Sequence, residues 1–249
     1  MGGRAALLAV VLVLAVGGGA VAAGAFEIGQ PLHTSFRFRA NPKKLPTSKR
    51  TPVRISISGR NWTDDGSHVP AVQKIELALD RHFALDVAGV PVCKGGSRQV
   101  RSATAEGCED ALVGRGTIEA EVAFPEEPMT TVTGTLRIYN LGRKPGGADL
   151  AGWAYFTAPI TGVLVIPIEV RRSNDVGRYG WKARMEVPKI AGGSGSIVSY
   201  SARIDKRIFS ATCGDGRLQV LADATFVDGT RSRAAGVRPC VMAEADARQ

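Results

Sequence analysis

Hydrophobic and polar residues alternate along most of this chain with a period of two, which is the pattern of half-buried β-strands. The alternation runs through residues 32–39, 53–58, 72–87, 117–124, 131–140, 181–187 and 217–237. From this pattern we expect an all-β protein, an antiparallel β-sandwich or distorted barrel of about ten to twelve strands.

Residues 163–170 differ from the other segments because they are apolar at nearly every position. Such a run predicts a strand at the centre of a sheet or buried on both faces. Pro167 has no backbone N–H to donate, so we expect this strand to lack a pairing partner on one side, or to carry a bulge, at that point. With the preceding 153–156, it is expected to form the middle of the fold.

One short helix is expected, over residues 102–113. A hydroxyl side chain at its start can cap it, and Cys108, Ala111 and Leu112 would share one face at i, i+3 and i+4. The stretch Asp80-Arg81-His82 contains residue types used in catalysis, but its place between two alternating segments favours a bend between strands.

The clearest local signal is Asp228-Gly229, which lies between the alternating segments 217–227 and 230–237. It predicts a β-hairpin with a two-residue turn. In that register Cys240 faces Arg217, so Cys213 is offset from Cys240 by four residues. A disulfide between them would require a bulge, or a fold-back of the chain after Cys213.

The cysteines, Cys93, Cys108, Cys213 and Cys240, are even in number, which in an exported chain predicts two disulfides. Among the three connectivities, Cys93–Cys108 with Cys213–Cys240 is favoured because each pair closes a short segment. A zinc site is the alternative, but the chain has no Cys-x-x-Cys pair and its histidines show no ligand spacing. We expect neither a metal nor a cofactor.

The N-terminus has the layout of a secretory signal peptide. Arg4 precedes the apolar run 5–16, and small-residue cleavage patterns end at Ala22 and Ala25. We therefore expect residues 1–25 to be a leader and residues 26–249 to form one β-rich domain that is secreted or held in the cell envelope. The alternative is an uncleaved membrane anchor, since the apolar segment is just long enough to span a bilayer.

The formal net charge of +9 becomes +8 when Arg4 leaves with the signal peptide (+9 − 1). Outside the cytoplasm a basic surface meets anionic surface polymers or lipid headgroups, and nucleic acid is not expected as a partner. The alternative is that the basic residues only keep the protein soluble. The charge is unevenly spread, however, because residues 37–60 contain no Asp or Glu. The candidate binding residues in this stretch are Arg37, Arg39, Lys43, Lys44, Lys49, Arg50 and Arg54. If the strands at 32–39 and 53–58 are neighbours, these charges merge into one patch.

Catalytic motifs are absent from the sequence. No window matches the Gly-x-Ser-x-Gly of a nucleophile elbow, and the glycine-rich stretch 192–196 lacks the third glycine of a dinucleotide site and the lysine of a P-loop. Adjacent carboxylates such as Asp64-Asp65 point to opposite faces of a strand, so they do not indicate a glycosidase pair. A binding or scaffold protein of the cell envelope that contacts an anionic polymer is therefore the leading hypothesis. The alternatives are a β-barrel carrier of an apolar small molecule and a hydrolase of wall polysaccharide.

Several short blocks carry a resemblance to known proteins. Val-Pro-Lys-Ile-Ala-Gly-Gly-Ser-Gly-Ser at 187–196, Cys-Gly-Asp-Gly at 213–216 and Phe-Val-Asp-Gly-Thr at 226–230 resemble a group of exported β-rich proteins of unknown function from high-GC Gram-positive bacteria. Arg-Thr-Pro-Val at 50–53 and Leu-Val-Gly-Arg-Gly at 112–116 are similar to earlier blocks of the same group. The resemblance implies export and a β-rich architecture, and it carries no activity, ligand or catalytic residue with it.

Overall fold

The computed structural model describes residues 32–95, 100, 105–124, 126–157, 159, 161–174 and 177–242, apart from the side chains of residues 205–207 and 242. The signal peptide expected at residues 1–25 lies outside these ranges. Within them, no helix has both the length and the hydrophobicity needed to cross a membrane.

Strands account for most of the described chain, and the prediction of an all-β antiparallel protein is confirmed. Short 3-10 turns occur at η1 (Glu109–Ala111) and η2 (Ala191–Gly193). The strands are β1 Leu32–Asn41, β2 Lys44–Leu45, β3 Thr51–Thr63, β4 Val72–Asp80, β5 Phe83–Leu85, β6 Leu112–Val122, β7 Thr130–Lys144, β8 Gly147–Phe156, β9 Gly162–Arg172, β10 Tyr179–Glu186, β11 Gly195–Ala211, β12 Arg217–Phe226, β13 Arg231–Pro239 and β14 Val241–Met242.

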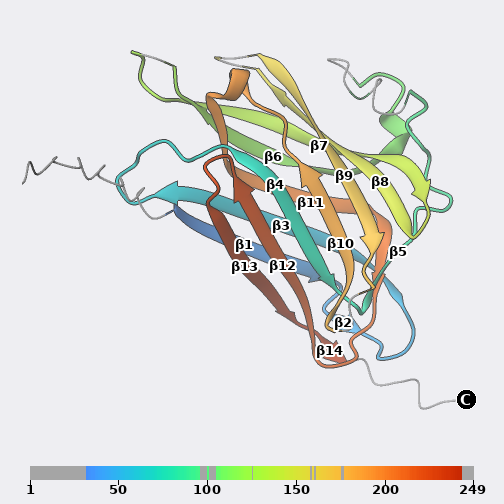
Figure 1. The fold of residues 1–249 in the computed structure, drawn as a ribbon. Helices are drawn as coiled ribbons and strands as arrows, with labels where there is room; N and C mark the ends of the chain where they lie inside the picture. Colours follow the sequence, from blue (N-terminus) through green and yellow to red (C-terminus); the bar gives the residue numbers. More distant parts are fainter. Residues whose placement is uncertain are drawn as a thin grey trace, which may run out of the picture.

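One 12-stranded antiparallel sheet forms the body of the fold, in the order β1-β3-β11-β6-β7-β8-β9-β10-β4-β12-β13, with β5 beside β11. A separate parallel pair joins β14 to β2. The sheet rolls so that its edge strands β1 and β13 lie side by side (Figure 1), although the ladder does not close between them. Gly236 permits this approach, because a Cβ there would lie 2.5 Å from the Cβ of Phe38.

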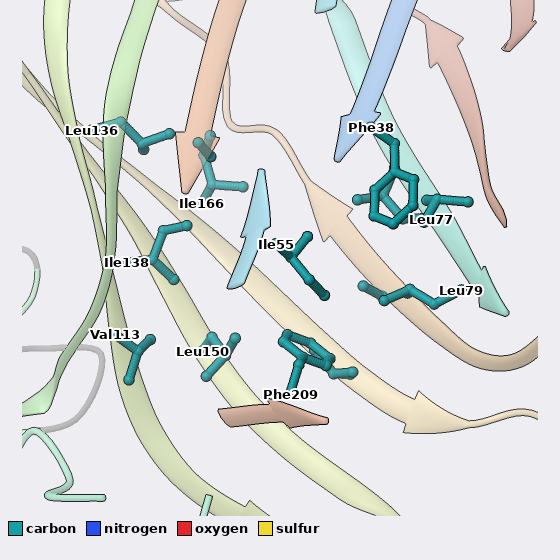
Figure 2. Packing of buried hydrophobic residues seen from close by; sticks show 14 of the residues in the cluster. Phe38, Ile55, Leu77, Leu79, Val113, Leu136, Ile138, Leu150, Ile166 and Phe209 are labelled. Carbon is teal, nitrogen blue, oxygen red and sulfur yellow. The ribbon is translucent and has the colours of Figure 1, made fainter. Parts of the chain in front are cut away.

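The main hydrophobic core lies inside the rolled sheet. Figure 2 shows side chains from different strands pointing into this interior, among them Ile55 of β3, Leu79 of β4 and Leu150 of β8. These are the apolar positions of the alternation, and the polar positions between them face outward. The period of two that is visible in the sequence therefore separates the inner from the outer face of the sheet.

A second, smaller cluster lies on the outer face, where the chain between β5 and β6 covers β7, β8 and β9. Its buried members include Cys93, Cys108, Tyr139 and Trp153. Asn140, which is completely buried, fixes this segment because its side-chain amide donates to the carbonyl oxygens of Val90 and Pro91, each at 3.1 Å. Both faces of the sheet are therefore buried here.

This cover explains the continuous apolar run at 163–170. Leu164 and Ile166 face the main core, while Val163 and Val165 pack against the outer cluster. Strands β8 and β9 are also central in the strand order, as predicted. Pro167 pairs with a residue of β8 and lies beyond the last β9–β10 pair of the described ladder, so its missing N–H leaves no gap in that ladder.

The prediction of a helix over residues 102–113 is wrong for the part of this segment that the structure describes. Residues 101–104 lie outside the described chain, but from Cys108 onward there is a single 3-10 turn at Glu109–Ala111, and β6 begins at Leu112. The apolar spacing that suggested a helix instead reflects packing against the outer cluster, to which Cys108, Ala111 and Leu112 all belong. The bend expected at residues 80–82 is present, between β4 and β5.

The C-terminal hairpin forms with a register one residue away from the prediction. Thr225 pairs with Arg231, and the Phe226 N–H donates to the Thr230 carbonyl oxygen, so the loop holds three residues instead of two. Gly229, at φ 85°, adopts the left-handed conformation that ends such a loop.

Both predicted disulfides are present, Cys93–Cys108 and Cys213–Cys240. In the observed register Cys240 lies next to Gly216, to whose carbonyl oxygen its N–H donates at 3.0 Å. The chain folds back between Cys213 and the start of β12, with Gly216 at φ 77°, and brings the two cysteine Cα atoms to 6.0 Å. Of the two ways in which the offset between the cysteines could be closed, a bulge or a fold-back of the chain, the structure has the fold-back.

Candidate anion-binding surface

Four arginines lie in one line across the outer face of the sheet, at positions that the strand pairing places side by side. Arg39 of β1 pairs with Ser56 of β3, which also pairs with Arg203 of β11. Arg203 pairs with Arg115 of β6, and Arg115 pairs with Arg137 of β7. We call Arg39, Arg203, Arg115 and Arg137 the arginine row. Neighbouring strands lie about 4.8 Å apart, so the four strand steps of the row cover roughly 19 Å.

A parallel line of hydroxyl groups runs beside the arginine row, two residues away on each strand. Ser58 pairs with Ser201, Ser201 with Thr117, and Thr117 with Thr135. The hydroxyl oxygens of Thr117 and Ser201 lie 3.0 Å apart. Arg37 stands at the β1 end of this line, opposite Ser58. The two lines together present guanidinium groups and hydroxyl groups to the same space.

An open groove of about 570 Å³ lies over this part of the sheet. Its charged lining residues are Arg37, Arg39, Arg115 and Arg203, and its polar lining includes Ser56, Ser58, Thr117 and Ser201. No carboxylate is among the described side chains that line it. Guanidinium groups bind carboxylate, sulfate and phosphate oxygens through a planar fork of N–H donors, and hydroxyl groups add further donors. The groove is therefore chemically suited to an anion.

The structure brings only part of the predicted patch into this groove. Strands β1 and β3 are neighbours, as the patch required, and Arg37 and Arg39 line the groove. Arg54 is exposed on β3 and pairs with Asn41, two residues from the arginine row on both strands.

The remaining four predicted residues lie on the loop between β1 and β3, at one end of the sheet. Lys43, Lys44, Lys49 and Arg50 are all exposed. The loop is attached to the C-terminal end of the chain, because Lys44 pairs with Val241. Arg50 donates to the carbonyl oxygen of His82 at 2.9 Å. None of these four side chains lines the groove as described.

Sequence reasoning missed Arg115, Arg137 and Arg203 as members of the site. Arg137 occupies a polar position of the alternating segment 131–140, so its outward direction could be predicted, whereas Arg115 and Arg203 lie outside the alternating segments. That the three arginines lie side by side could not be predicted, because β11 inserts between β3 and β6, and both of these strands are far from β11 in sequence. Arg137 is further fixed by Trp153, whose ring lies 5.3 Å from the guanidinium carbon in a cation–π contact.

Among the described side chains, the cluster around Asp80 and His82 most resembles a catalytic site. Asp80 has no exposed surface, and its Oδ1 lies 2.7 Å from Nδ1 of His82, while its Oδ2 lies 2.8 Å from Nη2 of Arg178. Nη1 of Arg178 in turn donates to Oδ2 of Asp215 at 2.8 Å. The other ring nitrogen of His82 faces Gly214, where a Cβ would collide with it. These contacts tie β4, β10 and the turn before β12 together, and the histidine has no described nucleophile as a partner.

The charges in this cluster shift one another's pKa values. Burial raises the pKa of Asp215, but the hydrogen bond and positive charge of Arg178 outweigh burial, so this pKa lies below its ordinary value. Burial lowers the pKa of Arg178, and its hydrogen bond to Asp215 together with the charge of Asp80 outweighs that effect and raises it. Both shifts favour the ionised forms of Arg178 and Asp215, so this ion pair holds the start of β10 to the turn before β12.

Within the described ranges, no three His, Cys, Asp or Glu side chains come together in a way that could hold a metal ion. No protein-family model matches the chain, and no curated protein matches it.

Proposed function

We propose that this protein is a binding protein of the cell envelope whose arginine row holds a linear anionic polymer. The observation that carries the proposal is the direct pairing of Arg203, Arg115 and Arg137 on three neighbouring strands. Like charges at directly opposite positions destabilise a sheet. A polyanion bound over the row would neutralise these charges. Binding therefore explains why like charges are paired here, whereas a need for solubility alone does not.

The extent of the row favours a polymer over a small anion. A single phosphate or carboxylate spans one strand spacing, whereas the row covers roughly 19 Å across five strands. Arg37 and the hydroxyl line widen the surface on one side without a described carboxylate in the groove. A chain of repeating acidic groups that crosses the strands would meet several guanidinium groups at once, and each contact would be individually weak and screened by salt.

The disulfides and the basic composition support placing this function outside the cytoplasm. Two disulfides form between the described cysteines, as is usual for proteins of oxidising compartments. The formal net charge of +9, or +8 without Arg4 (+9 − 1), attracts the acidic polymers of a cell surface. Both observations fit the exported protein expected from the N-terminal sequence.

Retention on an immobilised sulfated polysaccharide such as heparin, eluted with a salt gradient, tests the proposal. The double variant Arg115→Gln/Arg203→Gln removes two charges from the groove. Lys43→Gln/Lys44→Gln removes the same two charges from the loop, where the net charge changes equally but no groove residue is lost. We expect the groove variant to elute at clearly lower salt than the parent and the loop variant to elute close to it.

Equal shifts in the two variants would mean that net charge alone governs retention and would overturn the proposal. The same pair of variants, sedimented with vesicles that contain an anionic phospholipid, separates a polymer from a membrane surface as the partner. Binding to vesicles that depends on Arg115 and Arg203, without matching retention on the polymer, would assign the groove to lipid headgroups instead.

A further inference from the structure

The interior of the rolled sheet contains a cavity of about 150 Å³ between its opposite walls. Twenty residues from eight strands line it, and all but one of their side chains are hydrocarbon, thioether or absent altogether. The exception is Tyr200, whose hydroxyl is the one polar side-chain group in the described lining. The cavity is a separate feature from the arginine row, which lies on the outer face.

The size of the sheet explains why the cavity exists. Barrels of about eight strands have interiors that side chains just fill. Here an 11-strand path curls until β1 meets β13, and a larger number of strands gives a wider interior. Gly152 and Ala183 enlarge the cavity, because larger side chains at these two positions would extend into it.

Water is a poor occupant of this space. A buried water molecule needs two to four polar partners, and the lining offers one hydroxyl group. Cavities of about 150 Å³ lined by Leu, Ile and Phe in other proteins stay free of water and bind benzene or xenon. An apolar molecule of matching volume would recover the dispersion contacts that the facing side chains lack.

We propose that the interior cavity binds a neutral apolar molecule of about benzene size, or an apolar group of that size on a larger ligand. The chemistry of the lining excludes charged groups and disfavours hydrogen-bonding ones, since they would lose their water contacts without replacement. Ile197 lines both the cavity and a pocket of about 520 Å³ at one end of the sheet, beneath the chain that connects β10 to β11. The pocket therefore adjoins the cavity at Ile197.

Methyl NMR of the folded protein, titrated with benzene, tests this proposal. We expect the methyl signals of Ile138, Leu150 and Ile166 to shift, and those of the exposed Val237 and Val241 to stay in place. The melting temperature should rise by roughly 3–6 °C at a benzene concentration ten times its dissociation constant. Pyridine, which has the same shape but a hydrogen-bond acceptor, should bind at least tenfold more weakly.

Gly152→Val is the variant that fills the cavity, and Gly162→Val is its matched control, because a Cβ at Gly162 meets no atom within 4 Å. We expect the first to abolish the benzene-induced shifts and the second to retain them. If Gly152→Val does not fold, Gly152→Ala serves instead, because its Cβ would sit at an ordinary contact distance of 3.6 Å from Ile166. It should weaken benzene binding severalfold.

Absence of methyl shifts with benzene in the parent protein would overturn the proposal, as would equal binding of benzene to the parent and to Gly152→Val. Equal binding of pyridine and benzene would show that the interior is polar in practice and would overturn it as well. These results do not depend on the arginine row, so the two proposals stand or fall separately.

Discussion

The carboxylate of Asp80 lies 2.8 Å from the guanidinium of Arg178 and has no contact with solvent. It ends β4, and Arg178 immediately precedes β10, so the pair joins two neighbouring strands at one end of the sheet. Asp80 also accepts the backbone N–H of Gln219 on β12 at 3.2 Å. A single buried side chain therefore connects three consecutive strands of the sheet.

Replacement Asp80→Asn should destabilise the protein strongly. The substitution removes the buried carboxylate charge, and Arg178 keeps only its pair with the more exposed Asp215. The expected loss in free energy of unfolding is about 3 kcal/mol. Urea denaturation measures it. Asp223→Asn is the control, because Asp223 pairs with Arg233 at an exposed position, and its loss should cost no more than about 1 kcal/mol. Similar losses in the two variants would contradict the structural role of the cluster.

Arg115→Thr should make the protein more stable while weakening its binding of polyanions. Arg115 faces an arginine on each neighbouring strand, and relief of like-charge pairs in a sheet is worth about 0.2–1 kcal/mol. Arg37→Thr, which faces Ser58, should leave the stability unchanged. Urea denaturation at low and high salt decides this, since screening should shrink the gain from Arg115→Thr. A destabilised Arg115→Thr variant would show that the arginine serves the fold and not a ligand.

Stability should fall at alkaline pH because of Tyr200. Burial raises the pKa of its phenol from 10.0 to about 12. Between these values the unfolded chain ionises and the folded one does not, so the unfolded state gains and the free energy of unfolding declines as pH rises from 10 toward 12. Tyr200→Phe should show a smaller decline over the same range. Parallel pH profiles for parent and variant would disprove the assignment to Tyr200.

The contact between the two edge strands should be sensitive to Gly236. A Cβ at this position would lie 2.5 Å from the Cβ and 3.2 Å from the backbone nitrogen of Phe38, so Gly236→Ala must push β13 away from β1. The cost is expected to be about 1–3 kcal/mol, as for other overpacked sites. Gly162→Ala, which meets nothing within 4 Å, should be close to neutral. Thermal denaturation compares the two. Equal melting temperatures would show that the edges separate without loss.

Local features of the sequence determined the strands and the disulfides. Alternation at 53–58 or 131–140 reports burial of one face, which depends on the residues themselves, and the strands formed there. Cys93–Cys108 and Cys213–Cys240 each close a segment of moderate length, 15 and 27 residues, and these pairs were favoured for that reason. The apolar run at 163–170 likewise predicted a strand that is central in the sheet or covered on both faces, and β9 is both.

Features that depend on distant partners were decided only by the tertiary structure. The hairpin at Asp228-Gly229 took a three-residue loop because its register is also fixed by the pairing of β12 with β4. A helix was expected over residues 102–113 because apolar spacing cannot distinguish a helical face from a turn packed on a sheet. The arginine row and the cavity both depend on the order of strands that are far apart in sequence. In this order β11 lies between β3 and β6, and β4 lies between β10 and β12. That order is set by long-range pairing, whereas the period of two records only which way each side chain points.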